Sequence, residues 1–211
     1  MWTYLLWNHD GVLVDTEKWF FVATRDSLST LGVEMDQATY LRLMAEGRPY
    51  WDLARQHGLP ETAIVEARAE RDRQYQQFLA TEPLEIDGVA DVLSELHRAY
   101  RMAIVSTSRR DDFALIHRAR HIRPFFEFVI TIEDCERAKP APDPYETALR
   151  RFNAHPREAI AIEDSSRGLA SALAAGLPCM IIQNAFTEAQ DFTGARRILR
   201  SIRELPDALA R

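Results

Sequence analysis

Residues 4–17 read YLLWNHDGVLVDTE, and this stretch decides the fold. Four apolar residues, Tyr4 to Trp7, lead directly into a polar turn that begins at Asn8 and Asp10. A short apolar run without polar alternation is typical of a strand buried on both faces of a parallel sheet. In doubly wound α/β folds, ligands bind outside the carboxyl ends of such strands. The stretch therefore predicts a parallel sheet with its functional residues directly after the strands.

The rest of the chain repeats this unit of strand and helix. Further apolar runs cover 102–105, 128–131, 159–162 and 180–182. Helical patterns lie between them, for example at 89–96 and after Pro142, where Asp143 can cap a helix and Pro144 can occupy its first turn. This alternation predicts an α/β fold with an open, doubly wound, Rossmann-like parallel sheet of about five or six strands.

Residues 17–83 interrupt that alternation. They show no convincing strand, and their apolar spacing predicts helices over 18–31, 37–45, 51–57 and 61–79. The last of these is so dense in charge, Arg71 included, that we expect one solvated face. We therefore expect a Rossmann-like core from 1–16 and 84–211, with an inserted all-helical cap over 17–83.

Composition narrows the classes of function. The 211 residues are 46% hydrophobic and carry a net charge of −6, which suits a globular domain and argues against a nucleic-acid partner. The two cysteines form no CxxC pair, and no apolar run is long enough to span a membrane. Without a signal-like start, these features favour a cytoplasmic protein, and nothing calls for more than a monomer or weak dimer.

The turns after the strands carry the candidate chemistry. Carboxylates cluster in the first and fourth turns, and hydroxyls and one lysine in the others. The residues concerned are Asn8, Asp10, Ser106, Thr107, Lys139, Glu163 and Asp164. Clustered carboxylates repel one another, so they suggest a bound hard cation such as Mg²⁺. Hydroxyls and a lysine can hold the oxygens of a phosphoryl group.

These turns resemble the four motifs of the haloacid dehalogenase-like hydrolases, close to the β-phosphoglucomutase-like and phosphatase branch. The first motif stands here as NHDGVLVDT over residues 8–16. The second is the turn at Ser106, the third is Lys139-Pro140 and the fourth is Glu163-Asp164. Each motif alone is a weak signal, but the four occur in order at strand ends.

The resemblance implies a role for each residue. The residue at position 8 attacks phosphorus and forms an aspartyl phosphate, while Asp10 acts as general acid and base. Asn8, the Asp10 backbone carbonyl, Asp164 and Glu163, directly or through water, are the implied Mg²⁺ ligands. Ser106 and Lys139 hold the phosphoryl group, and Thr107 adds its backbone N–H. Arg48 of the cap can contact substrate, although a solvated arginine is the more ordinary interpretation.

Asn8 departs from this pattern, because the family has an aspartate there. An amide is a poor nucleophile and carries no charge, so covalent chemistry and metal affinity should both fall. His9 is unusual too, since the family generally has an apolar residue at that position. A designed change made to trap a complex and a natural inactive protein both explain Asn8. The intact remaining motifs favour the former, and the sequence leaves both open.

The leading hypothesis is a Mg²⁺-dependent phosphatase that acts on a small phosphate monoester such as a sugar phosphate. A phosphosugar mutase is the nearest rival, but Phe20 stands where a mutase has a histidine, and Arg71 where it has a lysine. Asp10 and the acidic fourth motif argue against a dehalogenase. A phosphonatase would have a small residue in place of Asp10 and would supply a cap lysine, so it fits poorly. A non-catalytic protein that binds a phosphorylated ligand stays open because of Asn8.

Overall fold

The computed structural model describes residues 2–118 and 120–210. The chain divides into two compact units. One comprises Met1–Asp15 and Leu84–Arg211, and the other comprises Thr16–Pro83. We call them the core and the helical insertion and describe each by itself.

The core is built on a six-stranded sheet in the order β3-β2-β1-β4-β5-β6, in which every pairing is parallel. The strands are β1 (Tyr4–Trp7), β2 (Arg101–Val105), β3 (Phe128–Ile130), β4 (Ala159–Glu163), β5 (Cys179–Ile182) and β6 (Arg197–Leu199). This confirms the predicted fold class. The apolar runs located the first five strands to within one residue at each end. β6 has no such run, because two of its three residues are exposed at the edge.

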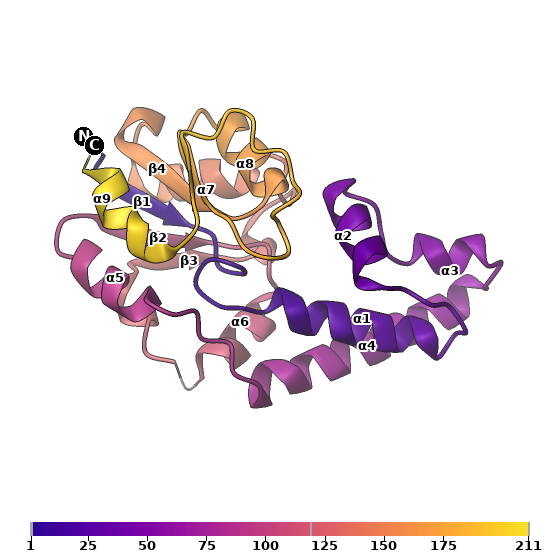
Figure 1. The fold of residues 1–211 in the computed structure, drawn as a ribbon. Coiled ribbons are helices and arrows are strands. Elements are labelled where there is room, and N and C mark those ends of the chain that lie inside the picture. Colours follow the sequence, from indigo (N-terminus) through magenta and orange to yellow (C-terminus); the bar gives the residue numbers. More distant parts are fainter. Residues whose placement is uncertain (1, 119, 211) are drawn as a thin grey trace. The chain divides into compact units, whose positions relative to one another are not determined.

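Helices cover both faces of the sheet, as a doubly wound fold requires (Figure 1). Leu5 and Trp7 of β1 pack with α5 (Val89–Leu96), α6 (Arg110–His117) and α9 (Leu205–Leu209). Leu6 packs on the other face with α7 (Asp143–Phe152) and α8 (Ser166–Ala174). Successive side chains of a strand point to opposite faces, so the residues on both faces of β1 must be apolar. That is why the run shows no alternation.

One expectation about α7 is wrong. Pro144 lies in the first turn as predicted, but Asp143 is itself the first helical residue, and Pro142 takes the N-cap position. The Asp143 carboxylate accepts from Arg137 at 3.1 and 2.9 Å instead of capping the helix. The arginine holds the pKa of Asp143 below its usual range. Short 3₁₀ turns complete the core: η1 (Arg123–Phe125), η2 (Ile132–Asp134), η3 (Pro156–Glu158) and η4 (Ile202–Glu204).

The helical insertion contains four helices: α1 (Glu17–Ser29), α2 (Gln37–Ala45), α3 (Asp52–Gln56) and α4 (Glu61–Thr81). α1 packs against α4, where the Phe20 and Tyr75 rings lie 5.2 Å apart. The prediction that Arg71 belongs to a solvated face is wrong. It is buried with its guanidinium 4.5 Å from the centre of the Phe20 ring, where a cation is attracted to the ring face. Among the described residues, no helix is long and apolar enough to cross a membrane.

Candidate functional site

Asn8 follows β1 at the point where the direction of strand addition reverses. The chain runs from β1 to β2 and β3 on one side, and then to β4, β5 and β6 on the other. The backbone N–H of Asn8 donates to the Ile162 carbonyl at 2.8 Å, which continues the pairing of β1 with β4 beyond the strand. Such a switch point is where doubly wound sheets bind ligands.

The Asn8 side chain makes three hydrogen bonds in a buried position. Its Nδ2 donates to the Asp10 carbonyl at 2.8 Å and to the Oδ1 of Asp164 at 3.0 Å. Its Oδ1 accepts from the Nζ of Lys139 at 2.9 Å. A lysine ammonium only donates, and a carbonyl or a carboxylate only accepts. The partners therefore fix which amide atom is oxygen and which is nitrogen.

The turn after β1 places Asp10 beside Asn8 and leaves room for the carboxylate of Asp164, which follows β4. The backbone closes through Gly11 N–H to Val14 O and Leu13 N–H to His9 O, both at 2.8 Å. Gly11 has a φ of 78°, and a Cβ there would lie far inside van der Waals contact with the Asp164 carboxylate. A glycine is needed at this position for both reasons.

Lys139 is buried, and its ammonium group is fully engaged. Besides Asn8, it donates to the Val105 carbonyl at 2.8 Å and to the Oε1 of Glu163 at 2.6 Å. Three donors therefore meet three acceptors. The lysine connects the carboxyl ends of β1, β2 and β4, although it lies on the loop between η2 and α7.

Glu163 is the counter-charge of this lysine. Its side chain is completely buried, and its Oε1 also accepts from the hydroxyl of Tyr145 at 2.7 Å. Burial raises the pKa of the Tyr145 phenol, and the nearby carboxylate raises it further. Gly168 of α8 leaves the space for this carboxylate, since a Cβ there would overlap it.

Asp10 is held by hydroxyl groups from the turn after β2. Its Oδ2 accepts from the hydroxyl of Ser108 and, at 3.3 Å, from that of Ser106. The hydroxyl of Ser106 in turn accepts from the Ser108 backbone N–H at 2.9 Å. The Nδ1 of His9 lies 3.3 Å from the same carboxylate oxygen.

Sequence reasoning missed three residues of this network: Ser108, Tyr145 and Asn184. Asn184 follows β5, and its Nδ2 donates to the Oδ2 of Asp164 at 2.9 Å. Ligands bind outside the carboxyl ends of the strands in such a sheet, so an inspection of the turn after the fifth strand would have found Asn184. Ser108 stood two residues beyond Ser106 in the same turn. Nothing in the sequence marks Tyr145, whose spacing fits a core position of α7.

The structure therefore brings together Asn8, Asp10, Ser106, Lys139, Glu163 and Asp164 in one hydrogen-bonded network of the core. Thr107 is half-buried beside Ser106. Arg48 belongs to the helical insertion, where its guanidinium lies 3.5 Å from Glu46 on an exposed face. The part of the chain that the structure describes contains no group of three or more His, Cys, Asp or Glu side chains arranged to hold a metal ion.

The oxygen groups nevertheless fit Mg²⁺ in part. The Asp10 carbonyl and the Asp164 carboxylate converge on one point, because a single nitrogen of Asn8 donates to both. These are the hard oxygen ligands that Mg²⁺ prefers. Asn8 fits less well, since its oxygen accepts from Lys139 and turning the amide would direct its N–H groups at the ammonium. An aspartate at position 8 would offer one carboxylate oxygen to Lys139 and the other to the metal ion.

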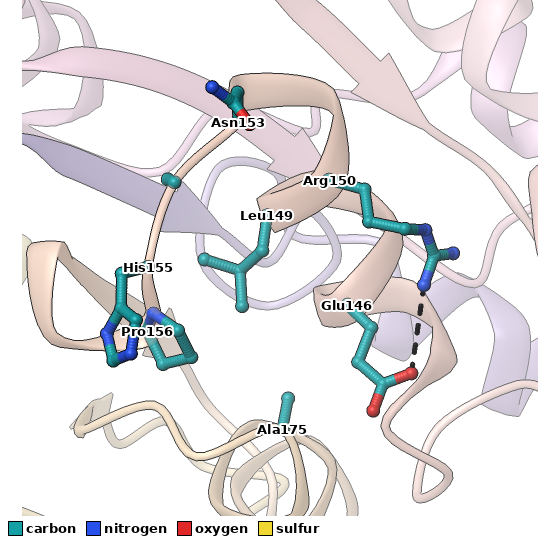
Figure 2. A pocket seen from close by; sticks show the side chains of 8 residues that line it. Glu146, Leu149, Arg150, Asn153, His155, Pro156 and Ala175 are labelled. Atoms are coloured by element: carbon teal, nitrogen blue, oxygen red, sulfur yellow. Dashed lines mark ion pairs between the residues drawn. The ribbon is translucent and has the colours of Figure 1, made fainter.

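A separate shallow hollow lies near the end of α7 (Figure 2). Its lining residues are Glu146, Leu149, Arg150, Asn153, Ala154, His155, Pro156 and Ala175. They precede β4 or follow α8, so the hollow shares no residue with the network described above. Its one ion pair, Arg150 with Glu146 at 3.8 Å, is largely exposed.

The fold and the groups that match the four family motifs define a hydrolase of the haloacid dehalogenase-like class. The sequence model of that family, described as haloacid dehalogenase-like hydrolase, matches residues 5–182, and the chain belongs to this family. Protein CbbY of Cereibacter sphaeroides is 31% identical to this chain, and the match covers 95% of this chain and 93% of that protein.

Two further matches involve phosphorylated sugars. A crystal structure of an aspartate-to-asparagine mutant of CbbY from Rhodobacter sphaeroides, in complex with xylulose-(1,5)bisphosphate, matches with a TM-score of 0.80 and 26% identity, over 95% of each chain. The fructose-1-phosphate phosphatase YqaB of Escherichia coli is 25% identical, over 85% of this chain and 95% of that protein.

Proposed function

We propose that this chain carries the site of a Mg²⁺-dependent phosphatase for a small phosphorylated sugar or related metabolite, and that Asn8 lets it bind the ester without turning it over. The observation that carries the proposal is the Asn8 network. Each charged or hydroxyl group that the family motifs assign to phosphoryl transfer lies beside Asn8 or is linked to it.

With an aspartate at position 8, a carboxylate oxygen would attack phosphorus and form an aspartyl phosphate. Asp10 would give its proton to the departing oxygen and later accept one from the attacking water. Lys139 and Ser106 would balance and orient the phosphoryl oxygens. Mg²⁺, when bound by Asp164, the Asp10 carbonyl and residue 8, neutralises phosphoryl charge. An amide oxygen is far less basic, and here it already accepts from Lys139.

The substrate class comes from the relatives. One relative is a CbbY mutant in complex with a sugar bisphosphate, and another is named as a sugar phosphatase. We propose a phosphorylated sugar for this chain on that basis, with Thr107 and Arg48 as substrate contacts. Arg48 supplies the kind of planar, charged donor that pairs with a phosphate oxygen.

A mutase is less well supported. Phe20 has no group that transfers a proton, and Arg71 is buried against it rather than presented to a ligand. The second candidate is a purely binding function, which the amide at position 8 favours. In both cases the ligand is a small phosphorylated metabolite.

The test is the Asn8→Asp variant, assayed on a panel of phosphate monoesters that includes fructose 1-phosphate and xylulose 1,5-bisphosphate, with and without Mg²⁺. We expect Mg²⁺-dependent phosphate release from Asn8→Asp and none above background from the parent chain. Asn153→Asp, a change of the same chemistry beside the distant hollow, is the matched control. Equal hydrolysis by parent and variant would refute residue 8 as the nucleophile, and inactivity of both would favour the binding function.

A further inference from the structure

His9 is the residue of the first turn to which the proposed reaction gives no role. It is completely buried, and its ring lies between the Asp10 carboxylate and His117 of α6. Its Nε2 lies 2.8 Å from the Nε2 of His117, and the Phe113 ring packs against both imidazoles at centroid distances of 4.8 and 4.3 Å. Two polar rings in such surroundings cost free energy unless their hydrogen bonds are satisfied.

If both imidazoles are neutral, one arrangement of protons satisfies these two hydrogen bonds. The Asp10 carboxylate only accepts, so the Nδ1 of His9 carries a hydrogen and donates to Oδ2. The Nε2 of a neutral His9 then has a lone pair, so the Nε2 of His117 donates to it. The Nδ1 of His117 is left as an acceptor, and among the described residues it has no hydrogen-bond partner. Burial, with His9 and Arg120 nearby, lowers the pKa of His117 to about 3, which keeps it neutral.

Three donors thus surround one oxygen of Asp10: the hydroxyls of Ser106 and Ser108, and the Nδ1–H of His9. The serines come from the turn after β2, and His9 from the turn after β1. His9 is the only one of the three that is anchored by a second buried ring. A carboxylate that accepts hydrogen bonds from two different turns cannot rotate freely about its χ2 bond.

We propose that His9, held in one tautomer by His117, is a positioning residue for Asp10. The inference rests on the proposed function, in which Asp10 exchanges a proton. With Oδ2 surrounded by donors, Oδ1 carries that proton. It passes from Oδ1 to the departing ester oxygen, and the attacking water later returns one to Oδ1. His9 and His117 neither gain nor lose a proton in either step.

The first test needs no turnover and no metal. Long-range ¹H–¹⁵N NMR of the chain as it stands reports which nitrogen of each histidine carries the hydrogen. We expect His9 protonated at Nδ1 and His117 at Nε2, and we expect His117→Phe to broaden or shift the His9 signals. A His9 protonated at Nε2, or one unaffected by His117→Phe, would overturn the proposal.

The second test is kinetic, in the Asn8→Asp background. His9→Asn keeps an N–H close to the position of Nδ1, whereas His9→Leu fills the space without a donor. We expect His9→Leu to lower kcat about tenfold to a hundredfold, a part of what a general acid contributes, with little change in KM. His9→Asn should recover most of that loss, and His117→Phe should give a smaller loss.

Equal losses in His9→Asn and His9→Leu, with both folded by circular dichroism, would assign His9 to packing alone and overturn the proposal. If Asn8→Asp itself releases no phosphate from any ester, the proposed function fails. The NMR result then still decides whether the histidine pair holds Asp10 in the orientation described.

Discussion

The side-chain nitrogen of Asn8 lies 3.0 Å from a carboxylate oxygen of Asp164 and donates a hydrogen bond to it. The same nitrogen donates to the Asp10 carbonyl at 2.8 Å. An aspartate in this place would bring a second anionic oxygen against Asp164, and the two would repel each other unless a cation lay between them. The amide N–H groups thus satisfy oxygens that would otherwise favour a metal ion.

We expect Mg²⁺ to bind this chain at least about tenfold more weakly than it binds the Asn8→Asp variant, because one anionic ligand is missing and the amide must turn. Calorimetric titration of Mg²⁺ into the two proteins, or electron paramagnetic resonance with Mn²⁺, measures the difference. Asp164→Asn in the Asn8→Asp background should weaken binding again. Equal affinities of the parent and Asn8→Asp would show that Asn8 does not hinder the metal.

Ester binding should survive the loss of the nucleophile. Lys139, the hydroxyl groups and the backbone N–H groups remain, and charge-assisted hydrogen bonds contribute roughly 1.5–3 kcal/mol each. Removing the nucleophile raises the barrier by more than about 5 kcal/mol. In calorimetric titrations at millimolar Mg²⁺, we expect this chain to bind a phosphate ester. We also expect it to bind a non-hydrolysable analogue at least as tightly as Asn8→Asp binds the same analogue. Failure to bind either ligand would mean that Asn8 abolishes recognition as well as chemistry.

The sequence was sufficient for the architecture because buried parallel strands have a strong local signature. β1 and β4 are apolar at every position except Glu163, the last residue of β4, and the turns after them are polar. β6 lacked the signature because it lies at the edge of the sheet. Arg71 was misassigned because a charged residue at a buried helical position looks like its solvated neighbours until Phe20 is placed beside it.

The site was predictable only where a motif marks it. The strand-end rule and the family motifs identified Asn8, Asp10 and Lys139. They could not indicate that the Lys139 ammonium is shared among Asn8, Val105 and Glu163, because those residues are far apart in sequence. Tyr145 was missed for the same reason, since its partner is 18 residues away.

Gly11 should be far less tolerant of a side chain than another glycine of similar backbone conformation. Gly11 and Gly176 have φ angles of 78° and 77°. A left-handed alanine costs about 1–2 kcal/mol at either position. At Gly176 the new Cβ meets Pro156 at an ordinary 3.7 Å, whereas at Gly11 it overlaps the Asp164 carboxylate. Gly11→Ala should therefore lose more stability in urea unfolding and also lose ligand binding, while Gly176→Ala should keep ligand binding.

Acid should destabilise the core partly through His117. Its pKa falls from an ordinary 6.5 to about 3 on folding, so between those values the unfolded chain holds a proton that the folded chain lacks. The contribution of His117 to the free energy of unfolding is therefore fully present above about pH 6.5 and is lost as the pH falls toward 3. His117→Leu and His117→Gln should both lose stability less steeply than the parent over this range in urea unfolding. An unchanged slope in both variants would show that His117 titrates alike in the folded and unfolded states.

Breaking the Lys139–Glu163 pair should cost far more stability than breaking an exposed pair with the same separation. Both Lys139–Glu163 and Arg101–Glu127 have closest N···O distances of 2.6 Å. The side chains of the first pair are 4% and 0% exposed, and those of the second 50% and 44%. Lys139→Met leaves the Glu163 carboxylate charged in a buried place, which should cost about 3–5 kcal/mol. Arg101→Met leaves a carboxylate that water solvates, so its loss should be much smaller.

Urea unfolding of the two methionine variants measures this difference, with an unchanged dependence on urea concentration showing that the unfolded state is the same. Adding Glu163→Gln to Lys139→Met should restore part of the stability, because an amide costs less to bury than an unpaired carboxylate. Adding Glu127→Gln to Arg101→Met should restore little. Equal losses in Lys139→Met and Arg101→Met would show that burial does not amplify the pair, and Lys139 would then be retained for ligand binding rather than for holding the strand ends together.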